Sequence, residues 1–153
     1  MFPGVGRHFF LTSKGRRVGL DAEERLCARE GLPDARVTRH AVSEGLGHMV
    51  NHMCLTVSIA AGPHTHALEL GWGPVMLREN TLVRGSPADV TGSVGLDVVN
   101  VDATTFRLRC DDALVKVDDI GQLVLGHPRP FETDPAWPSA YHFSVEDAAA
   151  PAL

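Results

Sequence analysis

The sequence predicts a mainly β protein, an antiparallel β-barrel or β-sandwich with one short N-terminal helix and a proline-rich C-terminal arm. Three observations support this fold class. From residue 36 onward, apolar residues recur with a period of two. In the second half of the chain, turn residues recur about every ten residues. After Gly126 this pattern stops, and four prolines follow within residues 127–143.

The N-terminal part, residues 1–35, is predicted to form a hairpin and a helix that pack on the core. Residues 8–20 contain two apolar arms around a short turn with Gly15, which is typical of a hairpin. Residues 21–31 form the predicted helix: Asp21 can cap it, Glu24 lies three positions later as in a capping box, and Gly31 can end it. A helix of about ten residues is not stable alone and must pack on the rest of the protein.

Residues 36–126 are predicted to form the antiparallel β domain. In residues 48–59, apolar side chains alternate with a mixed polar face, which indicates a strand. Shorter strands are expected at 65–70, 74–78 and 81–85, and residues 85–93 read as a loop. Four more strands are predicted as a meander, and barrel and sandwich remain open at this point. These four strands are residues 96–101, 104–110, 113–117 and 122–126. Residues 127–153 complete the chain as an extended arm.

Composition excludes several classes of partner. The net charge is −5 and the sequence has no basic run, so nucleic acid is not an expected partner. No apolar stretch reaches the roughly 18 residues that a membrane span needs, so no membrane is expected either. The three cysteines Cys27, Cys54 and Cys110 are odd in number and lie far apart. They are therefore expected to be buried free thiols and not a disulfide framework.

The histidines are the candidate metal ligands. His64, His66 and Glu69 resemble the H-x-H…E ligand run of cupins, but strand parity places Glu69 on the face opposite to the two histidines. His48 and His52 share a face in a strand or a helix, and a third ligand must come from elsewhere. The sequence also lacks nucleophile-elbow, dinucleotide-binding and P-loop motifs. We therefore expect no metal, no cofactor and no catalytic residue.

Two stretches, read together, resemble a β-rich module common in tail-, neck- and head-associated proteins of bacteriophages and prophages. The resemblance covers about residues 64–126. Its matching positions are His66, Leu68, Gly71, Gly73, Pro74, Val75, Leu77, Val98, Val99, Val101, Asp102, Ala103, Thr105, Phe106, Leu108, Ala113, Leu114, Asp119, Ile120 and Gly121. Ala67, Leu70 and Trp72 depart from the pattern, which has glycine, threonine and aspartate at those positions.

The resemblance implies roles for several of these residues. Gly71 and Gly73 would shape a turn, Pro74 would begin the next strand, and His66 would support the turn and not bind metal. The pattern around residues 98–106 would form a strand, a tight turn at Asp102 and a return strand that buries Phe106. On this interpretation the stretch at residues 63–79 is scaffold and not a reactive site.

The resemblance and the absence of a catalytic set predict a non-catalytic structural protein of a phage-like particle, in its neck, tail or capsid surface. Its partners would be other copies of itself and other virion proteins, and its location the virion assembled in the host cytoplasm, or otherwise the cytoplasm. Contacts are expected from residues 1–10 and 128–143, with Trp137, Tyr141 and Phe143 as anchors. The alternative is a small β-barrel metal-dependent enzyme or small-molecule binder that uses His48, His52, His64 or His66.

Overall fold

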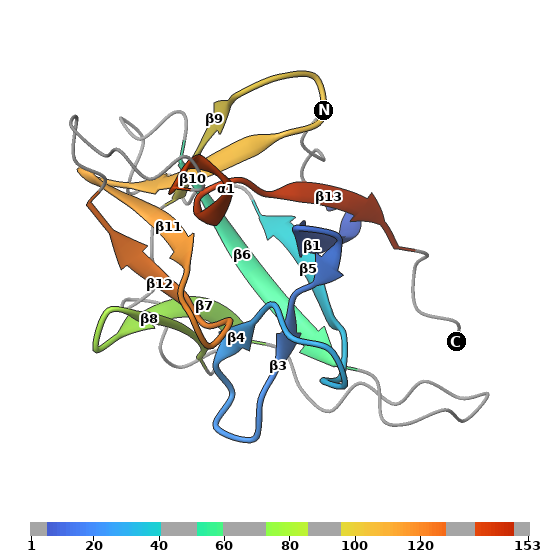
Figure 1. The fold of residues 1–153 in the computed structure, drawn as a ribbon. Coiled ribbons are helices and arrows are strands. Elements are labelled where there is room, and N and C mark those ends of the chain that lie inside the picture. Colours follow the sequence, from blue (N-terminus) through green and yellow to red (C-terminus); the bar gives the residue numbers. More distant parts are fainter. Residues whose placement is uncertain (1–5, 41–51, 60–72, 86–95, 128–136, 149–153) are drawn as a thin grey trace.

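The computed structural model describes residues 6–40, 52–59, 73–85, 96–127 and 137–148, which form a mainly β protein (Figure 1). The predicted fold class is confirmed at this level. Almost all of the regular structure in these residues is strand, and the one helix is a single turn. The elements are β1 (His8–Ser13), β2 (Arg16–Arg17), β3 (Gly19–Leu20), β4 (Leu26–Cys27), β5 (Ala35–His40), β6 (His52–Ile59), β7 (Gly73–Arg78), β8 (Thr81–Arg84), β9 (Leu96–Asn100), β10 (Phe106–Cys110), β11 (Ala113–Val117), β12 (Leu123–Gly126), α1 (Trp137–Ala140) and β13 (Ser144–Asp147).

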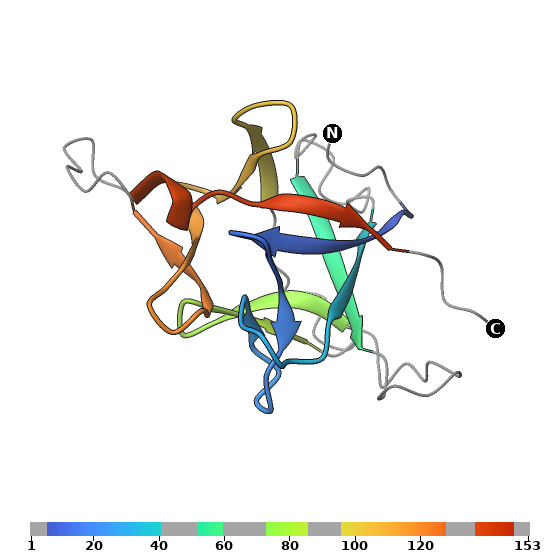
Figure 2. The same cartoon turned by 45° about the vertical axis from the view of Figure 1, so that its right-hand side comes forward.

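One large antiparallel sheet contains most of the strands. Its order is β13-β1-β5-β6-β7-β8-β12-β11-β10-β9, and β2 pairs with β1. β9 also pairs with β6, through His52 opposite Asp97 and Met53 opposite Leu96. β3 and β4 form a separate two-stranded sheet. The first and last strands of the chain, β1 and β13, therefore lie side by side, as Figure 2 shows.

The predicted turn with Gly15 is confirmed, a second tight turn joins β7 to β8, and backbone geometry explains why both are tight. Ser13 pairs with Arg16, which leaves Lys14 and Gly15 as a two-residue turn with φ angles of 53° and 76°. Glu79 and Asn80 join β7 to β8 with φ angles of 51° and 66°. Two consecutive positive φ angles are the signature of a type I′ turn, whose twist matches that of paired strands.

The predicted meander of β9, β10, β11 and β12 is also confirmed, because each strand pairs with the next in the chain. Aspartates shape two of its turns. Asp102 Oδ1 accepts the backbone N–H groups of Thr104 and Thr105, each at 2.9 Å. Asp118 Oδ1 does the same for two residues of the β11–β12 turn. Such side chain-to-backbone bonds favour turns over continued strands.

The core lies between the meander and the N-terminal strands. Burial alternates along β1, so that Phe9 and Leu11 point inward while Phe10 is half-buried. Phe106 and Leu108, predicted to be buried, are only 2 % and 1 % exposed. Burying each of these side chains stabilises the fold by about 2 kcal/mol. The core thus spans segments from both ends of the chain.

The predicted helix at residues 21–31 is wrong. Leu26, Cys27 and Ala28 are all buried, and three consecutive buried residues do not fit a helix with one exposed face. β4 instead pairs with β3, and Cys27 forms a further bridge to Gln122 in the β11–β12 turn. A helix of this length is marginal without tertiary contacts, so these pairings outweigh it.

The extended C-terminal arm is likewise wrong for the described residues 137–148. α1 leads into β13, which joins the large sheet beside β1. Tyr141 and Phe143 are 5 % and 1 % exposed, so both belong to the core of their own chain. Phe143 also exchanges two backbone hydrogen bonds with Phe106, at 2.7 and 2.8 Å. These two aromatic residues therefore are not exposed anchors for a neighbour.

Several sequence predictions fall outside the described residues. They include the strand at 65–70, the turn with Gly71, the loop at 85–93 after its first residue, the start of the strand at 48–59 and the side chain of Trp137. No helix among the described residues is long and apolar enough to cross a membrane.

Candidate functional site

Most of the histidines predicted as candidate metal ligands lie outside the described residues. His48, His64, His66 and Glu69 lie outside the described residues, and His52 is placed by its backbone in β6. In the described part of the chain, no group of three or more His, Cys, Asp or Glu side chains could hold a metal ion. The metal site therefore stays a hypothesis on those residues.

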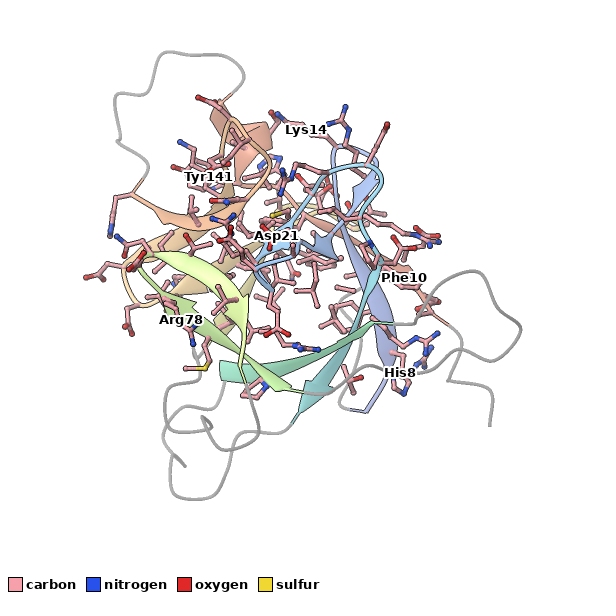
Figure 3. The ribbon with its side chains drawn as sticks, turned by 90° about the horizontal axis from the view of Figure 1, so that it is seen from below. His8, Phe10, Lys14, Asp21, Arg78 and Tyr141 are labelled. Atoms are coloured by element: carbon pink, nitrogen blue, oxygen red, sulfur yellow. The ribbon has the colours of Figure 1, made fainter. Side chains whose placement is uncertain are left out.

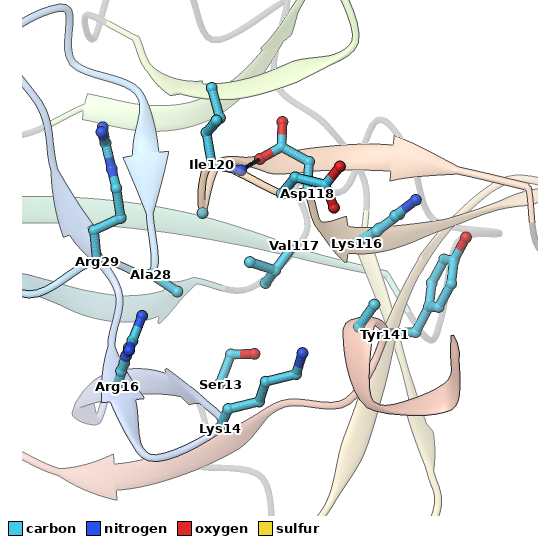
Figure 4. A pocket seen from close by; sticks show the side chains of 13 residues that line it. Ser13, Lys14, Arg16, Ala28, Arg29, Lys116, Val117, Asp118, Ile120 and Tyr141 are labelled. Atoms are coloured by element: carbon cyan, nitrogen blue, oxygen red, sulfur yellow. Dashed lines mark hydrogen bonds between the residues drawn. The ribbon is translucent and has the colours of Figure 1, made fainter. Parts of the chain in front are cut away.

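The described residues do form a cavity of about 840 Å³, which Figure 4 shows from close by. Its walls come from four segments that are distant in sequence: the β1–β2 hairpin, the residues after β4, the β11–β12 turn and the end of α1. A volume of this size is within the range of about 300–1,000 Å³ that is usual for small-molecule sites. The cavity is therefore the candidate functional site.

The cavity is positively charged, although the whole chain is acidic. Four cationic side chains line it, namely Lys14, Arg16, Arg29 and Lys116, and only two carboxylates, Asp118 and Asp119. Glu30 and Asp21 lie near Arg16 and Arg29, so the positive charge left without an ion pair among the described residues is that of Lys14 and Lys116. The chain as a whole has a net charge of −5. Positive charge is thus concentrated in one concave place on an acidic protein.

Arg29 is held in the wall from two sides. Its Nη2 lies 3.5 Å from Asp21 Oδ2 and 3.4 Å from Cys27 Sγ. Behind it, Gly121 has a φ of +87°, and a Cβ there would lie 2.5 Å from the Arg29 Cγ. Glycine is required at this position both for the backbone conformation and for the close approach of Arg29.

The two lysines lack the carboxylate partners that the arginines have. Arg16 lies 3.9 Å from the exposed carboxylate of Glu30, and Arg29 is near Asp21. For Lys14 and Lys116, no ion pair is found within the described part of the chain. In Figure 4 both lysine side chains extend toward the Tyr141 side of the cavity.

Two buried polar atoms of the lining residues also lack partners. Ser13 is 4 % exposed, and its Oγ has no hydrogen-bond partner among the described residues. The same holds for the Arg29 Nε. A buried polar group without a partner costs about 1–3 kcal/mol, so each such group in a native fold needs an explanation.

Asp21 supports the cavity wall from behind, and Figure 3 places it near the middle of the molecule. Its side chain is 8 % exposed, and its Oδ1 accepts the backbone N–H groups of Glu23 at 2.8 Å and Arg25 at 2.9 Å. Arg25 Nε also donates to Oδ2 at 3.0 Å. Burial raises the pKa of Asp21, but these hydrogen bonds and the Arg25 charge outweigh burial and lower the pKa below its usual value. Asp21 is therefore a buried, charged structural carboxylate.

Cys27 lies next to Asp21 and is fully buried. Burial raises the pKa of its thiol, and the nearby Arg29 only partly opposes this effect. The thiolate is the reactive form of cysteine. Cys27 is consequently a protonated core side chain at neutral pH and has no nucleophilic role in the cavity.

A second surface feature is the outer edge of β13. The Ala148 N–H donates to the His8 C=O, so the even-numbered residues of this segment direct their backbone groups toward β1. Backbone groups alternate between the two sides of an antiparallel strand. Val145 and Asp147 therefore direct their N–H and C=O groups away from β1, and no residue of the described part pairs with them there.

Arg17 connects the N-terminal hairpin to β13 through hydrogen bonds to Glu146. Its guanidinium donates to both carboxylate oxygens of Glu146, at 2.5 and 3.1 Å, and to Asp34 at 2.8 Å. It also stacks over the Phe10 ring, 4.2 Å from the ring centroid. The hydrogen bonds and charge of Arg17 hold the pKa of Glu146 below its usual value.

Replacing Arg17 with methionine should lower the Tm by a few degrees, because the partly exposed ion pairs are lost while contact with Phe10 is kept. The loss should shrink at high salt, since salt screens surface charges. Thermal unfolding of the wild type and the variant at low and high salt measures both effects. A loss of Tm that does not change with salt would contradict the electrostatic role.

The sequence did not predict the cavity. The sequence contains no basic run, but the fold gathers Lys14, Arg16, Arg29 and Lys116 from segments up to a hundred positions apart. Gly15, predicted as the turn residue of the first hairpin, gave a local signal beside Lys14. No signal along the chain links the β1–β2 turn to the β11–β12 turn, so only the tertiary fold identifies the site.

Fold and cavity together define the class: a small antiparallel β protein with a cationic cavity and, within the described residues, an outer strand edge on β13 that has no partner. Comparison with known proteins adds no family, because no protein-family model matches the chain and no curated protein shows significant similarity to it.

Proposed function

We propose that the chain is a non-catalytic structural subunit of a phage-like particle, in its neck, tail or capsid surface. It works there through contacts with other copies of itself and with other virion proteins. The observation that carries this proposal is the outer edge of β13, with which no described residue pairs. The resemblance of residues 64–126 to the phage module supports it, since the β7–β8 hairpin and the meander of β9–β12 have the strand order that the resemblance implies.

The proposal includes a closed barrel as the scaffold. The pairing of β9 with β6 supports a ring that runs from β6 through β7, β8, β12, β11, β10 and β9 back to β6. Closure removes strand edges from that ring. β5, β1 and β13 then extend the sheet outward from β6, which leaves β13 as the strand whose edge a neighbour can reach.

Strand addition is the expected mode of contact. An exposed edge offers a row of backbone donors and acceptors, and a strand from a neighbouring subunit can pair with it. Val145 and Asp147 provide these groups on β13. Two turn tips add exposed apolar side chains, Ile120 at 59 % and Val101 at 42 % exposure. Apolar side chains at exposed tips favour burial against a partner.

Replacing Val145 with proline should abolish self-association and leave the monomer folded. Proline removes the N–H on the outer edge, and this N–H makes no bond to β1. Val145→Ala is the matched control, because it shortens the same side chain but keeps the N–H. Sedimentation velocity over a range of concentrations measures the association, and circular dichroism checks the fold. A wild-type protein that stays monomeric at every concentration, or equal association of both variants, would refute the role of this edge.

The second candidate function is small-molecule binding, and the cationic cavity is the observation that favours it. The metal-dependent form of this alternative rests on His48, His52, His64 and His66. Stoichiometric metal in the purified protein, lost on replacing His48 and His52 together, would favour that form.

A further inference from the structure

We propose that the cationic cavity binds a small molecule through a phosphate group. This inference is independent of the virion role, because it rests on the cavity alone. The site is formed by the β1–β2 turn, Arg29 behind β4 and the β11–β12 turn. The ligand class follows from the charge, the buried polar atoms and the size of the cavity.

The charge of the cavity favours a dianion. Arg16 and Arg29 lie near the carboxylates of Glu30 and Asp21, so the excess positive charge of the lining comes from Lys14 and Lys116, which have no ion pair among the described residues. Asp118 also forms hydrogen bonds within the protein, because its Oδ1 accepts the N–H groups of Ile120 at 3.0 Å and Gln122 at 2.9 Å. A phosphate monoester carries a charge of about −1.5 to −2 at pH 7, and a single carboxylate only −1. Phosphate therefore matches the excess charge better than a carboxylate does.

The lining offers the donors that an oxyanion needs. Lys14 and Lys116 are cations without an ion pair in the described part of the chain, and ammonium groups are common phosphate ligands. The Ser13 hydroxyl and the Arg29 Nε are buried polar atoms of lining residues that lack a partner among the described residues. Phosphate oxygens accept hydrogen bonds from ammonium and hydroxyl groups, so a bound phosphate would pair with the two lysines, and with Ser13 once its buried hydroxyl turns toward the cavity.

The size of the cavity indicates a phosphorylated organic molecule and not inorganic phosphate alone. The volume of about 840 Å³ is far larger than a phosphate ion requires. Ile120, which is 59 % exposed, and Tyr141 lie on its wall. These side chains can contact an apolar or aromatic part of the ligand, while the lysines hold the phosphate.

Isothermal titration calorimetry of the full chain with pyrophosphate as the probe tests the site. We expect saturable binding by the wild type and affinity at least about tenfold weaker in the Lys14→Gln, Lys116→Gln double variant, because two charge-assisted contacts are lost. The matched control is Arg7→Gln, Arg78→Gln, which removes two positive charges from exposed positions outside the cavity. Figure 3 shows Arg78 well apart from Lys14. The control should bind like the wild type.

Two further measurements test the role of Ser13 and the preference of the site for phosphate. Ser13→Ala should weaken pyrophosphate binding without lowering the Tm of the unliganded protein, because the hydroxyl makes no hydrogen bond to any described residue in that state. Acetate should bind more weakly than pyrophosphate. No binding of pyrophosphate, equal binding of acetate, or an equal loss in the control variant would overturn the proposal. A monomeric protein that still binds pyrophosphate would refute the subunit role and leave this site intact.

Discussion

Phe143→Ala is expected to lower the free energy of unfolding by about 3–5 kcal/mol, as is usual for removing a fully buried phenylalanine. The Phe143 ring is 1 % exposed and belongs to the main core cluster. Its backbone joins β13 to Phe106 at the start of β10 through two hydrogen bonds. Removing the ring leaves a cavity where the C-terminal segment meets the meander, so both parts lose packing.

Denaturant unfolding at low protein concentration measures this loss for the monomer. Phe10→Ala is the matched control: the same aromatic ring is removed from the half-buried face of β1, where it lies under Arg17. Phe10→Ala should lower the free energy of unfolding much less than Phe143→Ala does. If the C-terminal segment were an arm for neighbouring subunits, Phe143→Ala would weaken assembly and leave the stability of the monomer unchanged.

Local pattern predicts much of this fold. The alternation of residues 106–108 places Phe106 and Leu108 on one face, and both are buried. Turn chemistry is also local, because Gly15 and Asn80 adopt positive φ angles at low cost. The meander follows, since neighbouring strands joined by short turns pair with each other.

The predicted helix is wrong because the residues that suggested a helix start also occur in turns. Asp21 accepts the backbone N–H of Glu23, as a helix cap would, but in a turn that leads to β4. Residues 21–31 also lack apolar side chains at the spacing of a helix face, and Leu26 and Cys27 are instead adjacent buried residues. A capping residue without a row of apolar side chains along one helix face is therefore not enough to predict a helix.

Pairing between strands that are far apart in the sequence cannot be predicted from the local pattern of residues. The prolines after Gly126 indicated a loose arm, and they say nothing about the strand Ser144–Asp147 that follows them. β13 forms because β1 offers it a partner more than a hundred positions away. The cavity depends on the same kind of information, since Lys14 and Lys116 meet only when β1–β2 and β11 are in place.

Asp21→Ala is expected to lower the free energy of unfolding by about 3 kcal/mol. Two backbone N–H groups, those of Glu23 and Arg25, lose their acceptor. Arg25 and Arg29 lose the carboxylate between them, and their partial exposure to water reduces the cost of leaving them unpaired. Asp21→Asn should cost less, because its amide oxygen can still accept the backbone bonds.

The effect of Asp21 should depend on pH in a defined direction. Its pKa is lowered in the folded protein, so the unfolded chain takes up the proton first as the pH falls. The stabilising contribution is therefore fully present above the unfolded pKa of about 3.9 and is lost as the pH falls through the folded pKa. The stability gap between the wild type and Asp21→Asn should narrow below about pH 4.

Urea unfolding of the wild type and Asp21→Asn between neutral and acidic pH measures this gap. Glu23→Gln is the control, because that carboxylate is exposed and its one ion pair among the described residues is with Arg25 at 3.3 Å. A gap that is constant with pH would show that the charge of Asp21 contributes nothing.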